Sequence, residues 1–145
     1  MQAEQNRLAA PPDAIDDDPL VGTVMSPRIV AITPDAPLGT ALRLMASGQV
    51  RHLPVLDGPR CTGIVLETDL VRAVAVGGPA AVGALVRRVP TVPVGARRSR
   101  VARALLDGDV DAVLVVDGEQ LVGIVTATDL VRSLAAAPPA RRAER

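Results

Sequence analysis

The hydrophobic positions of the chain alternate between a helical and a strand-like spacing. Between Leu38 and Met45, apolar residues recur at positions i, i+3, i+4 and i+7, which predicts an amphipathic helix that ends at Gly48. Short continuous apolar runs predict buried strands, and the Asp-Gly pairs at 57–58 and 117–118 are typical of tight turns between antiparallel strands. The predicted strands are 29–32, 53–56, 62–66, 89–92, 112–116 and 121–126, and the predicted closing helices are 68–76 and 128–136.

This pattern occurs twice, because the chain contains an internal repeat at an offset of 60 residues. The sequence GIVLETDLVR at 63–72 recurs as GIVTATDLVR at 123–132. Each repeat has a short opening helix followed by β-α-β-β-α, so we predict an α+β fold of two tandem duplicated units that pack together with pseudo-two-fold symmetry. The predicted limits are 18–77 for the first repeat, 78–137 for the second, and 1–17 and 138–145 for disordered tails.

Composition excludes several classes of function. The chain has 145 residues, and its acidic and basic residues balance at zero net charge, so nothing draws it as a whole to nucleic acid or to an anionic membrane. The chain has arginine but no lysine, which excludes lysine Schiff-base chemistry. The lack of Phe, Trp and Tyr excludes aromatic base stacking. One Cys and one His exclude an internal disulfide and a Cys/His zinc cluster. With no signal peptide or membrane-spanning run visible, we expect a cytoplasmic protein that binds neither membrane nor nucleic acid.

Three motifs carry a resemblance to a known family. They are VGTVM at 21–25, VRHLPVLD at 50–57 and GIV-x-x-x-DL at 63–70. Together with the duplication they resemble a pair of CBS domains, also called a Bateman module, over residues 20–136. The resemblance implies a stand-alone, non-catalytic regulatory homodimer, which senses an adenine nucleotide or adenosyl ligand between its repeats and signals to a partner protein. The implied candidate ligands are AMP, ADP, ATP and S-adenosylmethionine, with no required cofactor and no metal.

In the family that the chain resembles, an Asp after the last strand of each repeat marks the ligand site. This position is Asp69 in the first repeat and Asp129 in the second, where a carboxylate can accept hydrogen bonds from two ribose hydroxyls. A hydroxyl three residues earlier would donate to a phosphate. Thr126 supplies that hydroxyl in the second repeat, whereas Leu66 replaces it in the first.

A basic residue just before the middle strand is the second family feature. Arg51 and His52 stand there in the first repeat and would contact a phosphate, but Asp111 and Ala112 replace them in the second. The two half-sites therefore have complementary defects. The aliphatic residues expected to line the adenine are Ile29, Val30, Val89 and Pro90.

Plainer interpretations remain open for the same residues. Asp69 and Asp129 could serve only as helix caps, and Arg51 and His52 could be solvated surface charge. Cys61 is expected to be a small core residue rather than a nucleophile, because nothing orients His52 beside it. The replaced positions of the two half-sites favour the main alternative function, which is an interaction or scaffold protein of the same fold that has lost its ligand.

The helices also predict how the protein assembles. One pair of small sheets cannot cover all of their apolar residues, so we expect a two-fold symmetric dimer with an apolar helical interface. The apolar residues expected on these helix flanks are Leu38, Leu42, Met45, Val71, Val74, Val101, Leu105, Leu130 and Leu134.

Overall fold

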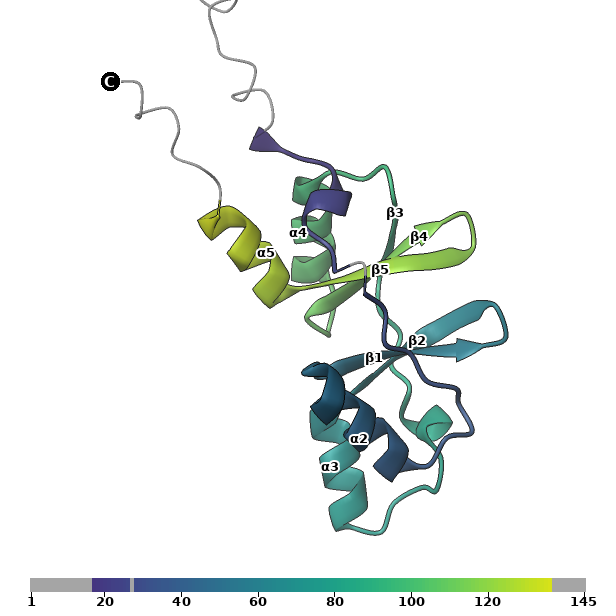
Figure 1. The fold of residues 1–145 in the computed structure, drawn as a ribbon. Helices are drawn as coiled ribbons and strands as arrows, with labels where there is room; N and C mark the ends of the chain where they lie inside the picture. The colour runs from purple at the N-terminus through teal and green to yellow at the C-terminus, as the bar shows by residue number, and fades with distance from the viewer. Residues whose placement is uncertain (1–16, 27, 137–145) are drawn as a thin grey trace, which may run out of the picture.

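The protein was analysed as a computed structural model, which describes residues 17–26 and 28–136. Apart from Asp17, the predicted tails lie outside these ranges. In the first repeat the elements are η2 (Val21–Thr23), α2 (Leu38–Gly48), β1 (His52–Asp57), β2 (Arg60–Leu66) and α3 (Glu67–Ala75). In the second repeat they are η3 (Val82–Leu85), β3 (Thr91–Pro93), α4 (Arg98–Asp107), β4 (Ala112–Asp117), β5 (Gln120–Thr126) and α5 (Ala127–Ala135) (Figure 1).

The strands of both repeats meet in the middle of the molecule, and the helices lie toward its two ends (Figure 1). The first sheet pairs β1 with β2 in antiparallel fashion, and the second sheet has the order β3-β4-β5, with β3 parallel to β4. Both hairpins shift register at the same place, after Val55 in one and after Val115 in the other. The predicted α+β fold of two duplicated units is therefore confirmed.

Each opening segment packs against the opposite repeat. Val21 of η2 is buried in the core of the second repeat, and Val82 of η3 is buried in the core of the first. The Val21 amide donates to the carbonyl of Ala96 at 2.8 Å, and the Val82 amide donates to the carbonyl of Ala36 at 2.9 Å. Packing thus crosses the sequence limits of the repeats, and neither repeat completes its core without the other.

The predicted strand at 29–32 does not form, although its counterpart in the second repeat contributes to β3. In the second repeat the Leu114 amide donates to the carbonyl of Pro90 at 3.0 Å and helps to hold this segment on β4. The equivalent position in the first repeat is Pro54, which has no N–H to donate. Only an isolated bridge, at Ile32, remains.

The helix α2 ends at Gly48 as predicted, but the residue that makes the stop is the next one. Gly48 is the last helical residue, and Gln49 makes the stop by adopting a left-handed backbone with φ of 56°. The next amide, that of Val50, donates to the carbonyl of Met45 at 3.0 Å, which satisfies the last turn. This turn directs the chain into β1 and leaves Gln49 and Val50 beside the pocket described below.

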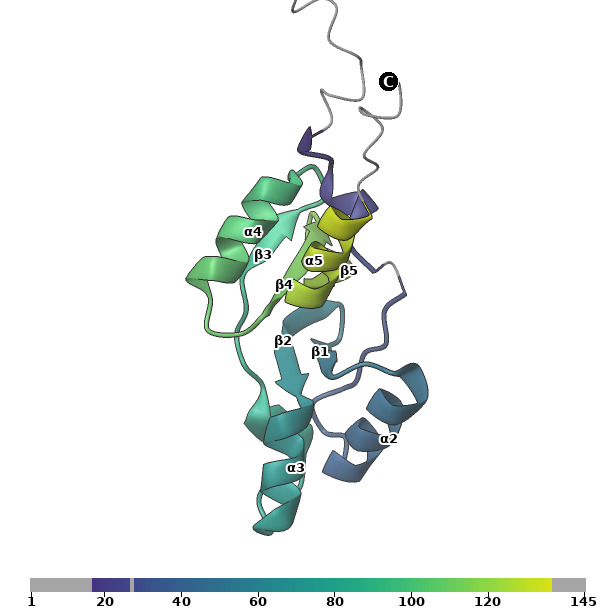
Figure 2. The same ribbon diagram turned by 90° about the vertical axis from the view of Figure 1, so that its left-hand side faces the viewer.

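The structure reduces the set of apolar residues on the helix flanks. Leu38, Met45 and Val101 are buried in the cores of their own repeats, so their prediction as flank residues was wrong. Leu42, Leu105 and Leu130 are partly buried and pack on the same cores. More than half exposed are Val71 and Val74 on α3 and Val131 and Leu134 on α5. These two stripes occupy equivalent repeat positions, with α5 in the upper half of the molecule and α3 in the lower half (Figures 1 and 2).

Candidate functional site

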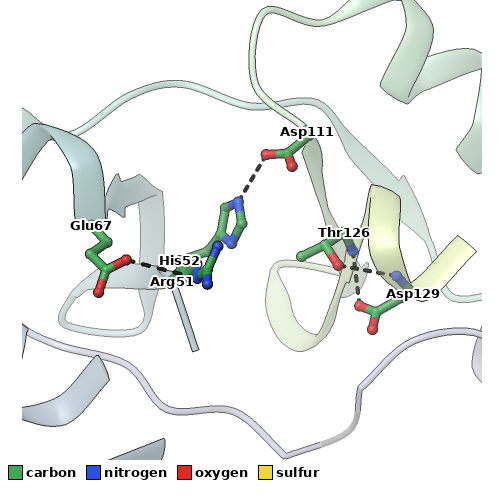
Figure 3. Close-up of polar contacts among 6 residues, drawn as sticks. All are labelled: Arg51, His52, Glu67, Asp111, Thr126 and Asp129. Carbon is green, nitrogen blue, oxygen red and sulfur yellow. Dashed lines mark hydrogen bonds and ion pairs between the residues drawn. The ribbon is translucent and has the colours of Figure 1, made fainter. Parts of the chain in front are cut away.

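A pocket of about 450 Å³ opens between the two repeats, beside the N-terminus of α5. The second repeat contributes Thr126 and Asp129, and the first repeat contributes Arg51 and His52 (Figure 3). Residues that the sequence assigned to two different, individually incomplete half-sites therefore line one cavity. The hydroxyl that the first half-site lacks and the basic residues that the second lacks are thus present in the same cavity.

Thr126 and Asp129 form a capping box at the start of α5. The Thr126 hydroxyl oxygen accepts from the Asp129 amide at 3.2 Å, and Asp129 Oδ2 accepts from the Thr126 amide at 2.9 Å. Asp129 therefore does cap α5, as the plainer interpretation expected. The cap does not use every hydrogen-bonding atom of Thr126 and Asp129. The Thr126 hydroxyl keeps its proton to donate, and within residues 17–26 and 28–136 the one charged group near Asp129 Oδ1 is Arg132 Nη1, at 3.7 Å. Both side chains can therefore cap the helix and still bind a ligand.

Arg51 and His52 enter the pocket from the start of β1. Arg51 Nε lies 3.8 Å from Glu67 Oε1, and its side chain is 83% exposed, so this pair is weak. His52 Nε2 lies 2.9 Å from Asp111 Oδ1, which belongs to the second repeat. Figure 3 shows His52 pointing toward Asp111 and Arg51 toward Glu67. Asp111, which replaces a basic residue in its own half-site, therefore contacts a basic residue of the other.

The corresponding aspartate of the first repeat is held by an ion pair. Both oxygens of Asp69 accept from Arg87, at 2.7 Å from Nε and 3.1 Å from Nη2. Hydrogen bonding to Asp69 raises the pKa of the Arg87 guanidinium further above its ordinary value. Asp69 does not line the pocket that contains Asp129, so the structure does not bring the two predicted ribose ligands together.

The half-site around Asp69 borders a separate pocket of about 410 Å³, and apolar side chains lie beside it. Leu66, which stands where a phosphate-binding hydroxyl was expected, packs against the buried cluster that includes Ile64, Val110 and Leu114. Val89 joins the same cluster. Of the four residues predicted to line adenine, Val30 lines the pocket, whereas Ile29, Val89 and Pro90 do not.

Two arginines of the pocket were missed by the sequence reasoning. Arg132 lies one helical turn after Asp129 and shares its face of α5, so helical spacing could have found it. Arg28 follows the segment that crosses to the second repeat. No local sequence pattern indicates that crossing, so nothing in the sequence could have placed Arg28 here.

Other candidate chemistry finds little support. The thiol of Cys61 is half buried and donates to the carbonyl of Gly63 at 3.5 Å, and burial raises its pKa. A thiol that stays protonated at neutral pH is a weak nucleophile. Within residues 17–26 and 28–136, no three His, Cys, Asp or Glu side chains are grouped to hold a metal ion. In the same part of the chain, no helix has the length and apolar character needed to cross a membrane.

Comparison with known proteins identifies the family. The CBS domain model matches residues 21–76 and 82–136, so the chain belongs to the CBS domain family and carries two copies of the domain. Pairs of CBS domains are regulatory modules. The chain is 28% identical over 110 residues to inosine-5'-monophosphate dehydrogenase of Thermoplasma acidophilum, a match that covers 75% of this chain.

Two solved structures show the same fold. The CBS domain pair of protein MJ0100, in complex with 5'-methylthioadenosine and S-adenosyl-L-methionine, superposes with a TM-score of 0.76 at 23% identity, covering 83% of this chain and 99% of that one. The CBS domain of the bacterial CNNM/CorC family Mg²⁺ transporter, in complex with ATP, gives a TM-score of 0.71 at 22% identity, covering 80% and 87%.

The curated relatives are longer than the part that this chain matches. The chain spans 22% of the dehydrogenase and 53% of protein MJ1225 from Methanocaldococcus jannaschii.

Proposed function

We propose that this chain is a regulatory module that binds one adenine nucleotide or adenosyl compound in the pocket between its repeats and signals the bound state to a partner protein. The observation that carries the proposal is the pocket itself. It places Thr126 and Asp129 opposite Arg51 and His52, which together supply a carboxylate, a hydroxyl and two basic groups around a cavity of about 450 Å³. A volume of this size is typical of small-molecule sites.

Each side chain has a separate role in this proposal. Asp129 Oδ1 accepts hydrogen bonds from the ribose hydroxyls, while Oδ2 continues to cap α5. The Thr126 hydroxyl donates to a phosphate, and the positive end of the α5 dipole favours the same anionic group. Arg51 and His52 contact the phosphate from the first repeat, and Val30 forms part of an aliphatic wall for adenine.

We expect one ligand per chain. Asp69 is a weaker candidate ribose ligand, because its bidentate pair with Arg87 already uses one acceptor site on each of its oxygens. The neighbouring Leu66 offers no hydroxyl for a phosphate. AMP, ADP, ATP and S-adenosylmethionine are the candidate ligands, and the ligands held by protein MJ0100 and by the CNNM/CorC transporter domain support this choice.

The proposed signal passes through the contact between repeats. A ligand that touches Asp129 and Arg51 at once bridges the two repeats and resists their relative motion. The exposed stripes on α3 and α5 would form the interface of a two-fold homodimer, in the cytoplasm, where a second copy or an effector protein would read the change.

A ligand scan tests the proposal directly. Thermal unfolding is followed with AMP, ADP, ATP and S-adenosylmethionine, and a true ligand at 100 times its dissociation constant stabilises the folded state by about 2.7 kcal/mol. Equilibrium dialysis then gives the stoichiometry, since the chain has no aromatic side chain to mask the ultraviolet absorbance of adenine. If no adenosyl compound binds, the ligand-free interaction protein becomes the better interpretation. Two equivalent sites per chain would contradict the role given to Arg87.

A further inference from the structure

The pocket carries an excess of positive charge. Three arginines line it, Arg28, Arg51 and Arg132, against one lining carboxylate, that of Asp129. Two further carboxylates lie behind the lining, Glu67 at 3.8 Å from Arg51 and Asp111 at 2.9 Å from His52, so the excess comes from Arg28 and Arg132. The whole chain, in contrast, has a formal net charge of zero. The excess is therefore a local property of this cavity, and it bears on which adenosyl compounds the site accepts.

Arg28 contributes a charge that has no carboxylate partner within the described part of the chain. Among residues 17–26 and 28–136, no carboxylate oxygen lies within 4.0 Å of its guanidinium. Its position is fixed by the crossing of the chain, because the amide of Ser26 donates to the carbonyl of Ile124 in β5 at 3.0 Å. Arg28 follows two residues later, on the rim of the pocket.

Arg132 adds a second guanidinium, on the α5 side. Its Nη1 lies 3.7 Å from Asp129 Oδ1, which is too long for a hydrogen bond, and its side chain is 73% exposed. A guanidinium has five N–H donors, so this loose pair leaves most of them free for a ligand. Arg28 and Arg132 thus stand in different repeats and both border the cavity that Arg51 enters.

We infer that Arg28 and Arg132 make this pocket selective for anionic nucleotides over neutral or cationic adenosyl compounds. The inference rests on the proposed function and names the ligand class for that site. Each phosphate brings negative charge next to a guanidinium, and charge-assisted bonds to Arg are about twice as strong as neutral ones. Methylthioadenosine brings no such charge, and S-adenosylmethionine places a positive sulfonium among three arginines.

Equilibrium dialysis of adenosine, AMP, ATP, methylthioadenosine and S-adenosylmethionine tests this selectivity. We expect the affinity to rise from adenosine to AMP to ATP and to be lowest for S-adenosylmethionine. Added salt should lower the affinity for ATP and leave the affinity for adenosine unchanged, because salt screens only the charged contacts. Arg28→Gln and Arg132→Gln should each weaken ATP about tenfold, as expected for the loss of one charged hydrogen bond, without weakening adenosine.

The repeat supplies matched controls for both substitutions. Arg88 and Arg72 stand 60 residues from Arg28 and Arg132 and do not line the pocket, so Arg88→Gln and Arg72→Gln should leave ATP affinity unchanged. Arg132→Lys should restore part of the loss in Arg132→Gln.

Three outcomes would overturn the inference. It is wrong if S-adenosylmethionine or methylthioadenosine binds as tightly as ATP, or if both Gln variants weaken adenosine as much as ATP. In those two cases the pocket still binds an adenosyl compound and the proposed function stands. Binding of none of the five compounds overturns the proposed function, and this inference with it.

Discussion

The half-sites around Asp129 and Asp69 have the same backbone arrangement but differ in the side chains that surround the aspartate. Both aspartates follow the second strand of a hairpin, at the third residue of the closing helix. Asp129 caps its own helix and faces an open pocket, whereas Asp69 makes no cap and is bound at both oxygens by Arg87. A duplicated motif therefore does not guarantee a duplicated site.

The difference originates outside the motif. Arg87 comes from the second opening segment, and its counterpart 60 residues earlier is Pro27, which has no charge to offer Asp129. The pocket beside Asp129 contains Thr126 and Arg51, whereas Leu66 and Asp111 stand at the equivalent repeat positions. A few substitutions at the repeat interface thus pair Asp69 with Arg87 and leave Asp129 without such a partner among the described residues.

The largest expected effect concerns a feature that the repeats share, the exposed stripes on α3 and α5. Leu134→Asp should weaken self-association by about 100-fold or more, because an unpaired carboxylate in an apolar interface costs several kcal/mol. Light scattering with refractive-index detection measures the mass. Leu106→Asp is the control, since Leu106 is 77% exposed on α4, outside the stripes. A wild-type protein that is monomeric at micromolar concentration contradicts the proposed dimer.

The comparison of the two aspartates predicts the next largest effect. Asp129→Ala should weaken AMP binding by about 1.5–3 kcal/mol, a loss of roughly 10- to 100-fold in affinity, because charge-assisted hydrogen bonds to the ribose are lost. Asp69→Ala should leave the affinity unchanged, because Asp69 does not line the pocket. Titration calorimetry measures both.

Asp129→Ala also removes a helix cap, so Asp129→Asn is needed as a second variant. Its amide oxygen can still accept from the Thr126 amide, which keeps the cap and removes only the charge. A normal affinity in both Asp129 variants would remove this residue from the site.

Arg51→Ala separates phosphate recognition from adenosine recognition. Arg51 is largely exposed, so we expect a loss of about tenfold for AMP, at the low end for a charged hydrogen bond, and no loss for adenosine. His52→Ala should have an effect in the same direction. Equal losses for adenosine and AMP would show that Arg51 is not a phosphate ligand.

A smaller effect is expected at Asp111, where the second repeat approaches the phosphate side of the pocket. Asp111→Asn removes a negative charge and frees His52 from its 2.9 Å pair, so AMP should bind about two- to fourfold more tightly. If dialysis shows weaker binding instead, the main role of Asp111 is to position His52.

The smallest expected effect compares the starts of α4 and α2. Asp18 accepts from the hydroxyl of Ser99 at 2.6 Å and from its amide at 2.7 Å, whereas the equivalent residue for α2 is Gly78, which has no side chain to cap it. These hydrogen bonds lower the pKa of Asp18 below its ordinary value of 3.8. The carboxylate therefore stabilises the fold above about pH 3.8, and this contribution is lost as the pH falls through the lower folded value. Thermal unfolding of wild type and Asp18→Asn should differ at neutral pH and converge in strong acid. A constant difference would contradict the assignment.

The sequence by itself determined the features that depend on local pattern. Hydrophobic spacing and Asp-Gly turns predicted the hairpins and closing helices, and the 60-residue offset predicted two copies of one α+β unit. The motif positions also predicted Thr126, Asp129, Arg51 and His52, which the structure gathers around one pocket. The predictions of elements and repeats are confirmed because each depends on residues close together in the chain, whereas the binding roles of these four residues stay predictions.

Only the tertiary structure decided which half-site is open. His52 and Asp111 are 59 residues apart, and Asp69 and Arg87 are 18 apart, so no local spacing couples either pair. The crossing of the opening segments buries Val21 and Val82 in the opposite repeats and brings Arg87 beside Ile64 and Asp69. The contact of His52 with Asp111 comes from the approach of one repeat to the other. Burial of apolar surface is non-directional, so the sequence shows that these residues are buried but not which core receives them.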